Sequence, residues 1–394
     1  MAEVELQPLP PKEAIDFYRQ KGFAIGFDHR DVWQEQHQAS FTVAKAMQLD
    51  LLQDIHAEID KALANGTTWR TFQRTLEPNL QARGWWGRKL VEDPQTGEMV
   101  EAQLGSPRRL KVIYDTNLRT AHSEGQWQRI QDHKAAFPYL EYDGRNSEHP
   151  RLDHAAWDGL VLPVDDPFWA NHFPVKAYGC KCRARPRTAS QVERSGQKVG
   201  PAPDVPLTPY VNKRTGEVQQ IPAGVEPSFH YPPGGRRAAL AKHLVDKLET
   251  APAEVARASI ADLVGGEAFS TWYSKPAGSF PLAYLSREGA ERLGGRTQLV
   301  ALSEDTLAKQ LREHPEITLD EYPLVQEALD RGREILDRDG SLIYVLDEED
   351  GYVTVIRATK SGRAIFMTSF RRLSRDAARR DREIQRLLRK QRKE

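Results

Sequence analysis

The chain has 394 residues, of which 39% are hydrophobic, and its 56 Lys and Arg balance its 56 Asp and Glu. This length predicts two to three domains, and zero net charge gives no global argument for nucleic-acid binding. There is no apolar run of about eighteen residues and no basic, apolar leader at the N-terminus, so we expect neither a membrane-spanning helix nor a secretory signal.

Residues 1–137 predict a mainly helical region. Apolar residues at a helical period predict a helix over 41–65, which the following Asn-Gly pair ends. A second helix is expected to open at Thr67 or Thr68, with Pro78 causing a kink or an early end. Residues 107–136 return to a helical pattern.

Residues 138–187 show no sustained period, which predicts short strands and ordered loops. This segment holds the only two cysteines of the chain, Cys180 and Cys182. A disulfide between residues two apart closes a small strained ring, so it is a poor structural crosslink. Two cysteines in a chain of this length fit a reducing compartment.

Thiolates and neutral imidazoles are good zinc ligands. We therefore consider a structural zinc site formed by His149, His154, Cys180 and Cys182, with His172 as a further candidate. Such a site would hold the intervening loop at its base. The spacing differs from that of a zinc finger, and the alternative is two reduced, half-buried thiols beside surface histidines.

Residues 188–235 are rich in proline and poor in large apolar residues, which predicts a linker or an extended arm. A small hairpin is expected near Tyr210, and such an arm is able to lie across a neighbouring subunit. Residues 236–279 predict two short helices, over 238–248 and 252–263.

Residues 280–394 predict a separate domain in which helices are followed by an antiparallel sheet and a basic helix, so the fold class is α+β. Ser303 is expected to cap a helix that runs through Glu313. A further helix is expected over 322–336. The predicted strands are 299–302, 341–347, 352–359 and 364–370.

The zero net charge hides an uneven distribution. Residues 303–350 hold fifteen Asp and Glu against five Lys and Arg, whereas residues 371–394 hold eleven Lys and Arg against four acids. A basic tail of this kind is able to neutralise phosphates. The alternative is a helix that folds back on the acidic segment of its own domain.

A long ordered set of residues surrounds the two cysteines, and further motifs lie upstream. These positions are Asp143, Arg151, His154, Gly159, Asp165-Asp166-Pro167-Phe168-Trp169, Pro174, Tyr178-Gly179-Cys180 and Cys182-Arg183, with Pro11-Lys12-Glu13-Ala14, Phe41 to Lys45, Gly84-Trp85 and Tyr114 to Ala121 upstream. Together they resemble the head-morphogenesis signature of the phage Mu minor head protein family. The resemblance covers residues 8–190 and departs from the family before the cysteines, where Val175-Lys176-Ala177 replaces a proline and an Asn-Gly. It implies a minor capsid protein of a tailed phage, assembled in the host cytoplasm, located in the virion head and contacting portal and capsid proteins.

The C-terminal domain carries Ala301-Leu302-Ser303 and Thr306 at its front and Phe366-Met367-Thr368-Ser369-Phe370-Arg371-Arg372 on its final strand. With its order of helices, sheet and basic helix, it resembles a phage-borne nuclease-like domain of the superfamily that groups barnase, EndoU, the ribonuclease colicins and RelE-type ribonucleases. This resemblance implies an alternative function, a packaged effector that cleaves host RNA without a metal. Cleavage needs a base, an acid and cations for the phosphate. The candidate catalytic residues are Arg357, Lys360, Thr368, Ser369 and Arg371. The structural alternative is that Thr368 and Ser369 are ordinary strand residues and that the arginines are exposed residues of the kind common at strand ends.

Overall fold

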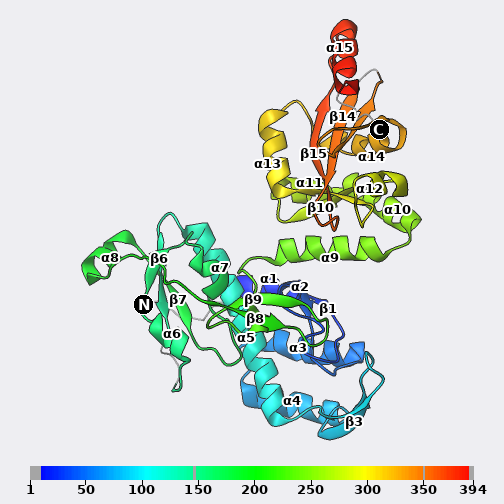
Figure 1. Cartoon of the computed structure of the whole chain (residues 1–394). Coiled ribbons are helices and arrows are strands. Elements are labelled where there is room, and N and C mark those ends of the chain that lie inside the picture. The colour runs from blue at the N-terminus through cyan, green and yellow to red at the C-terminus, as the bar shows by residue number, and fades with distance from the viewer. Residues whose placement is uncertain (1–9, 145–147, 349–350, 390–394) are drawn as a thin grey trace, which may run out of the picture. The chain divides into compact units, whose positions relative to one another are not determined.

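A computed structural model describes residues 10–144, 148–348 and 351–389 (Figure 1). The chain divides into two compact units, Met1–Arg236 and Arg237–Glu394. Helices and several small sheets occur together, which confirms the α+β class. Within the described residues no helix is both long and apolar enough to cross a bilayer.

Four helices build the first hydrophobic core of the N-terminal unit. Apolar side chains at helical spacing bury Leu52, Ile55, Ile59, Phe72 and Leu110 almost completely. The helices are α1 (Lys12–Arg19), α3 (Leu49–Asn65), α4 (Trp69–Ala82) and the long α5 (Pro107–His133), accompanied by α2 (Gln36–Ala39), a parallel pair of β1 (Gly22–Phe23) and β2 (Ser40–Phe41), and a hairpin of β3 (Arg88–Glu92) and β4 (Met99–Gln103).

Two details of these helices differ from expectation. The helix expected over 41–65 begins only at Leu49, because Phe41 pairs with Phe23 in the short parallel sheet. Pro78 does not end α4, since Leu76 and Leu80 on either side of it are both buried in the core. Tertiary packing outweighs the local cost of the proline here. Gly66, with φ of +66°, ends α3 as the sequence predicts.

A second core lies around a three-stranded antiparallel sheet in the order β6-β5-β7. Tyr142, Trp169 and Phe173 are its largest fully buried side chains, and Ile130 of α5 contributes to the same core. The expected short strands are confirmed, and two short helices are added to them. The elements are β5 (Tyr139–Asp143), α6 (Leu152–Ala156), β6 (Val161–Pro163), α7 (Phe168–His172) and β7 (Arg183–Arg187).

The proline-rich segment is not a free linker. It continues through α8 (Ala189–Ser195), the expected hairpin of β8 (Leu207–Val211) and β9 (Val218–Pro222), and η1 (Pro227–Phe229). Arg214 in the hairpin turn pairs with Asp31 and Asp93, both at 2.6 Å. Phe229 is buried. Segments that lie far apart along the chain supply these partners, so local composition could not reveal that the arm packs on its own unit.

The C-terminal unit is built on a six-stranded sheet in the order β10-β11-β15-β14-β13-β12, in which only β11 and β15 run parallel (Figure 1). One face carries the main core, and the other is covered by the basic helix α15. The strands are β10 (Ser279–Tyr284), β11 (Leu299–Ser303), β12 (Arg333–Leu336), β13 (Leu342–Leu346), β14 (Tyr352–Ala358) and β15 (Ile365–Arg372); the helices are α9 (Arg236–Thr250), α10 (Ala253–Val264), α11 (Glu267–Ser274), α12 (Arg287–Arg292), α13 (Glu304–Glu313), η2 (Leu319–Glu321), α14 (Leu324–Arg331) and α15 (Ala377–Leu388).

Most of the strands expected here are confirmed, but the helix expected over 322–336 is wrong in its second half. It stops at Arg331, and Arg333–Leu336 forms β12, which pairs with β13. Gly332 permits the turn, because a Cβ there would lie 2.3 Å from the Ala328 carbonyl oxygen. Three short helices, rather than two, lie between 236 and 279.

The basic C-terminal helix folds back on its own domain, which was the second of the two alternatives for this tail. Leu387 of α15 is buried against the sheet, and Glu383 forms an ion pair with Arg371 of β15. Arg380 lies 3.8 Å from Asp347 in the acidic segment.

Candidate functional site

Three of the proposed metal ligands converge in the N-terminal unit. His154 comes from α6, and Cys180 and Cys182 come from the loop that leads into β7. The His154 Nδ1 lies 3.3 Å from the Cys182 Sγ and 3.8 Å from the Cys180 Sγ. All three ligand atoms lie within 4.8 Å of one another. His154 and Cys180 are buried, and both thiols are free.

The orientation of the His154 ring is fixed from its far side. Its Nε2 lies 2.7 Å from the carbonyl oxygen of Gly224, so Nε2 carries the proton and donates it. The lone pair of Nδ1 then points toward the two sulfurs. The ring also stacks on Trp157 at 5.6 Å between centroids. The backbone at Gly144 lies close to the backbone at His154. A Cβ on Gly144 would lie 2.0 Å from the His154 carbonyl oxygen, so this position requires glycine.

The cysteine loop is held by its own backbone contacts. The amide of Cys180 donates to the Ala177 carbonyl at 3.2 Å, and Arg119 of α5 donates to the Cys180 carbonyl at 3.2 Å. The Cys182 Sγ lies 3.7 Å from the Gly144 carbonyl oxygen. The sulfurs are therefore positioned by α5, β5 and the loop before β7.

The contacts within the cluster favour the deprotonated form of one of the two thiols. The hydrogen bond between the thiols lowers the pKa of Cys180 well below its ordinary value and raises that of Cys182. Burial alone would lower the pKa of His154, but hydrogen bonds to Cys180 and to Gly224 raise it. A group of this kind can bind a soft metal ion or act as a thiolate–imidazole pair.

The other two histidines do not join the cluster. His149 is exposed, and the group formed by the described residues excludes it. Both ring nitrogens of His172 face carbonyl oxygens, of Phe168 at 3.2 Å and of Ala223 at 3.3 Å. Burial lowers the pKa of His172 to about 4, so it is a neutral core residue.

The five candidate catalytic residues lie on or between β14 and β15 but do not form one cluster of free groups. Arg357 pairs with Asp339, and Arg371 pairs with Glu383. Thr368 donates to the Val355 carbonyl at 3.2 Å. Ser369 lies opposite Val355 in the sheet. Lys360 is exposed in the turn between the strands.

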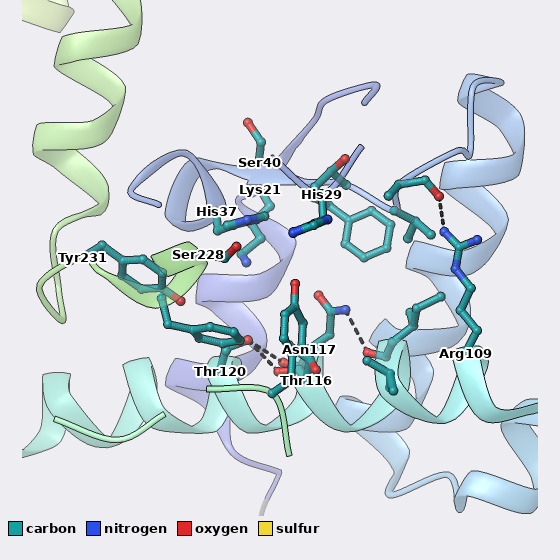
Figure 2. A pocket seen from close by; sticks show the side chains of 18 residues that line it. Lys21, His29, His37, Ser40, Arg109, Thr116, Asn117, Thr120, Ser228 and Tyr231 are labelled. Carbon is teal, nitrogen blue, oxygen red and sulfur yellow. Dashed lines mark hydrogen bonds between the residues drawn. The ribbon is translucent and has the colours of Figure 1, made fainter. Parts of the chain in front are cut away.

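A pocket of about 360 Å³ opens elsewhere in the N-terminal unit (Figure 2). Figure 2 shows the cationic side chains Lys21 and Arg109 on its wall with Asn117 and Tyr231. Among the described residues no Asp or Glu lines it. Burial lowers the pKa of Lys21 to about 8, although Glu124 acts in the opposite direction, and it lowers the pKa of Arg109 to about 10. The Arg109 guanidinium also donates to the carbonyl oxygens of Gln103, Leu104 and Ala44. An anionic group would be favoured there and a cation would not.

Neither this pocket nor the contact of Gly224 with His154 is predictable from the sequence. Its lining comes from four separate stretches, around 21–44, 109–120, 178 and 228–231, and no motif connects them. The last stretch and Gly224 belong to the arm, whose composition predicted a linker.

Comparisons with known proteins point to one group of phage proteins. Residues 53–185 match the family model described as Phage Mu protein F like protein. The chain is 29% identical over 387 residues to the putative capsid assembly protein F of Escherichia phage Mu, an alignment that covers 90% of this chain and 85% of that protein. It is 36% identical over 171 residues to the Mu-like prophage FluMu F protein of Haemophilus influenzae, which covers 42% of this chain and 40% of that protein. No solved structure matches the chain.

Proposed function

Because residues 53–185 of this chain form a Phage Mu protein F-like region, we propose that the protein acts in assembling the head of a tailed phage. The observation that carries this proposal is the long alignment with the capsid assembly protein of phage Mu, which takes in 90% of the chain. The N-terminal unit accounts for only 236 of the 394 residues, so the alignment extends into the C-terminal unit. Both units are therefore proposed to serve the same assembly role.

The finer assignment follows from the resemblance of the signature segment. The protein is proposed to be a minor component that works beside the portal, with portal and capsid proteins as its partners. It would assemble in the host cytoplasm and stay in the virion head.

Deletion of the gene from the phage genome tests this function. We expect lysates without DNA-filled heads by electron microscopy, and recovery when the gene is supplied from a plasmid. Cross-linking of complemented procapsids, followed by mass spectrometry, is expected to join this protein to the portal. A normal yield of DNA-filled heads without the gene would refute the assembly role.

The alternative, a packaged ribonuclease, requires its own test because its candidate arginines have structural partners. Arg371→Ala would also remove the ion pair with Glu383 that joins β15 to α15, so a loss of activity would have a structural explanation as well. The sharper variant is Lys360→Ala, in an exposed turn, with the exposed Lys275→Ala of the same unit as its matched control. The assembly role predicts that the purified wild type leaves RNA intact. RNA cleavage that Lys360→Ala abolishes and Lys275→Ala retains would support the ribonuclease instead.

A further inference from the structure

We propose that His154, Cys180 and Cys182 bind one zinc ion that joins α6 to the loop before β7 in the N-terminal unit. This inference concerns a metal site and does not depend on the proposed role in head assembly. It is based on the donor set, on the distances between the donors and on the group that orients the imidazole.

The donor distances agree with a tetrahedral zinc site. Zn–S bonds of about 2.3 Å and Zn–N bonds of about 2.0–2.1 Å place sulfur and nitrogen about 3.6 Å apart around a tetrahedral ion. The observed separations between the His154 Nδ1 and the sulfurs are 3.3 and 3.8 Å, which lie on either side of that value. One ion can therefore reach all three donors with only a small adjustment of the side chains.

The second contact of His154 is the one that metal-binding histidines usually have. Such a histidine donates its other ring N–H to a carbonyl or carboxylate, which fixes the tautomer and the ring orientation. Here the Gly224 carbonyl accepts from Nε2 at 2.7 Å and leaves Nδ1 free to coordinate. A histidine that merely filled the core would need no such orientation toward two thiols.

The burial of the cluster favours a structural ion over a thiol nucleophile. Cys180 is only 3% exposed. A substrate could not approach it without displacing the loop. Cys182 is half-buried, which leaves the fourth position of a tetrahedral ion accessible to a water molecule. Because thiolates are the zinc ligands, binding releases the thiol protons to solvent.

The ion would brace one wall of the cationic pocket. Tyr178, two residues before Cys180, lines that pocket, and its amide donates to Glu226 at 3.2 Å. The amide of Glu226 donates to the Lys176 carbonyl at 2.9 Å. Ser228, labelled in Figure 2, follows on the same wall. Zinc would therefore join α6 to the cysteine loop next to the pocket, and the hydrogen bond from His154 to the Gly224 carbonyl would link this pair to the arm.

Elemental analysis of the purified full-length protein tests the site directly. We expect close to one zinc per chain in the wild type and a loss of most of it in Cys180→Ser and Cys182→Ser. His149→Ala is the matched control, because this histidine is exposed and outside the cluster, and it should retain zinc. Replacement by Co²⁺ should give the absorption of a thiolate-bound tetrahedral ion.

A measurement on the wild type alone covers the case in which the variants fail to fold. Both thiols should resist a thiol-specific reagent until a strong chelator is added, and then react. Protein with reduced thiols that contains no zinc, and whose thiols react at the same rate with and without added zinc, would overturn the proposal. A disulfide between Cys180 and Cys182 in protein prepared under reducing conditions would overturn it as well. Neither result bears on head assembly, which the gene deletion tests separately.

Discussion

Replacing Gln310 by leucine should destabilise the sheet of the C-terminal unit. The side chain of Gln310 in α13 is buried. It forms with one residue of β15 the two hydrogen bonds that a neighbouring strand would otherwise form. Its amide nitrogen donates to the Phe370 carbonyl at 2.5 Å, and its carbonyl oxygen accepts from the Phe370 amide at 3.2 Å. The need arises because β11 pairs with β15 only as far as Phe366. Beyond that point this edge of β15 has no strand beside it.

The magnitude follows from the two backbone groups that lose their partner. Each buried polar group left without a hydrogen bond costs about 1–3 kcal/mol, so Gln310→Leu should cost about 2–6 kcal/mol. Gln310 is only 2% exposed, so water cannot easily replace the side chain. A loss of about 2 kcal/mol corresponds to a roughly 30-fold larger equilibrium constant for local opening of the sheet.

The chain offers a matched control on the outer edge of the same sheet. Gln326 of α14 accepts from the Tyr284 amide at 2.7 Å and donates to the Tyr284 carbonyl at 3.1 Å, in the same two-bond arrangement. Gln326 is half-buried, so water can take its place. Gln326→Leu should therefore cost about 1 kcal/mol.

Hydrogen exchange followed by mass spectrometry is the suitable assay, because it reports on peptides of one unit in a two-unit chain. Peptides that contain Phe370 should exchange much faster in Gln310→Leu than in the wild type, while peptides of the N-terminal unit should not change. Equal exchange in the two proteins would show that the Phe370 groups do not depend on Gln310. A larger effect from Gln326→Leu than from Gln310→Leu would refute the argument from burial.

Three further predictions concern single side chains. Ser303→Ala should lower stability by about 1 kcal/mol, measured by urea unfolding, because its hydroxyl accepts from the Thr306 amide at 3.2 Å and caps α13; no change would show that the cap is not needed. Trp169→Ala should cost about 3–5 kcal/mol, since this side chain is 1% exposed in the second core, and an unchanged melting temperature would contradict that burial. Burial lowers the pKa of Lys176 to about 7. The free-energy cost of burying its charged ammonium group on folding is therefore fully present below pH 7 and disappears as pH rises from 7 toward 10.5. The stability of Lys176→Met relative to the wild type should therefore be highest near pH 6 and fall above pH 7 in parallel unfolding titrations, whereas a pH-independent difference would contradict the lowered pKa.

The outcome for the arginines shows a limit of sequence-based site prediction. Cationic residues on a strand are candidates for phosphate binding only while their partners are unknown. The structure pairs Arg357 with Asp339 and Arg371 with Glu383, and neither carboxylate could be assigned from spacing along the chain. Their proposed catalytic roles remain predictions that the RNA assay tests.

The sequence by itself determined the features that depend on near neighbours. Helical spacing of apolar residues located α3, α4 and α5, the turn sequences between the strands located β13, β14 and β15, and Ser303 marked the start of α13. The uniqueness of the two cysteines also identified the segment that holds the candidate metal site. These signals are local, because periodicity and capping depend on residues within a few positions of one another.

Only the tertiary structure decided which distant groups meet. It brought His154, rather than His149 or His172, to the two cysteines, and it brought Gly224 to the far side of the ring. It converted the end of a predicted helix into β12, because Ile335 gains a partner in Ile343. It also packed the proline-rich arm on its own unit. Each of these outcomes depends on contacts between residues far apart in the chain. Composition and local spacing do not predict such contacts.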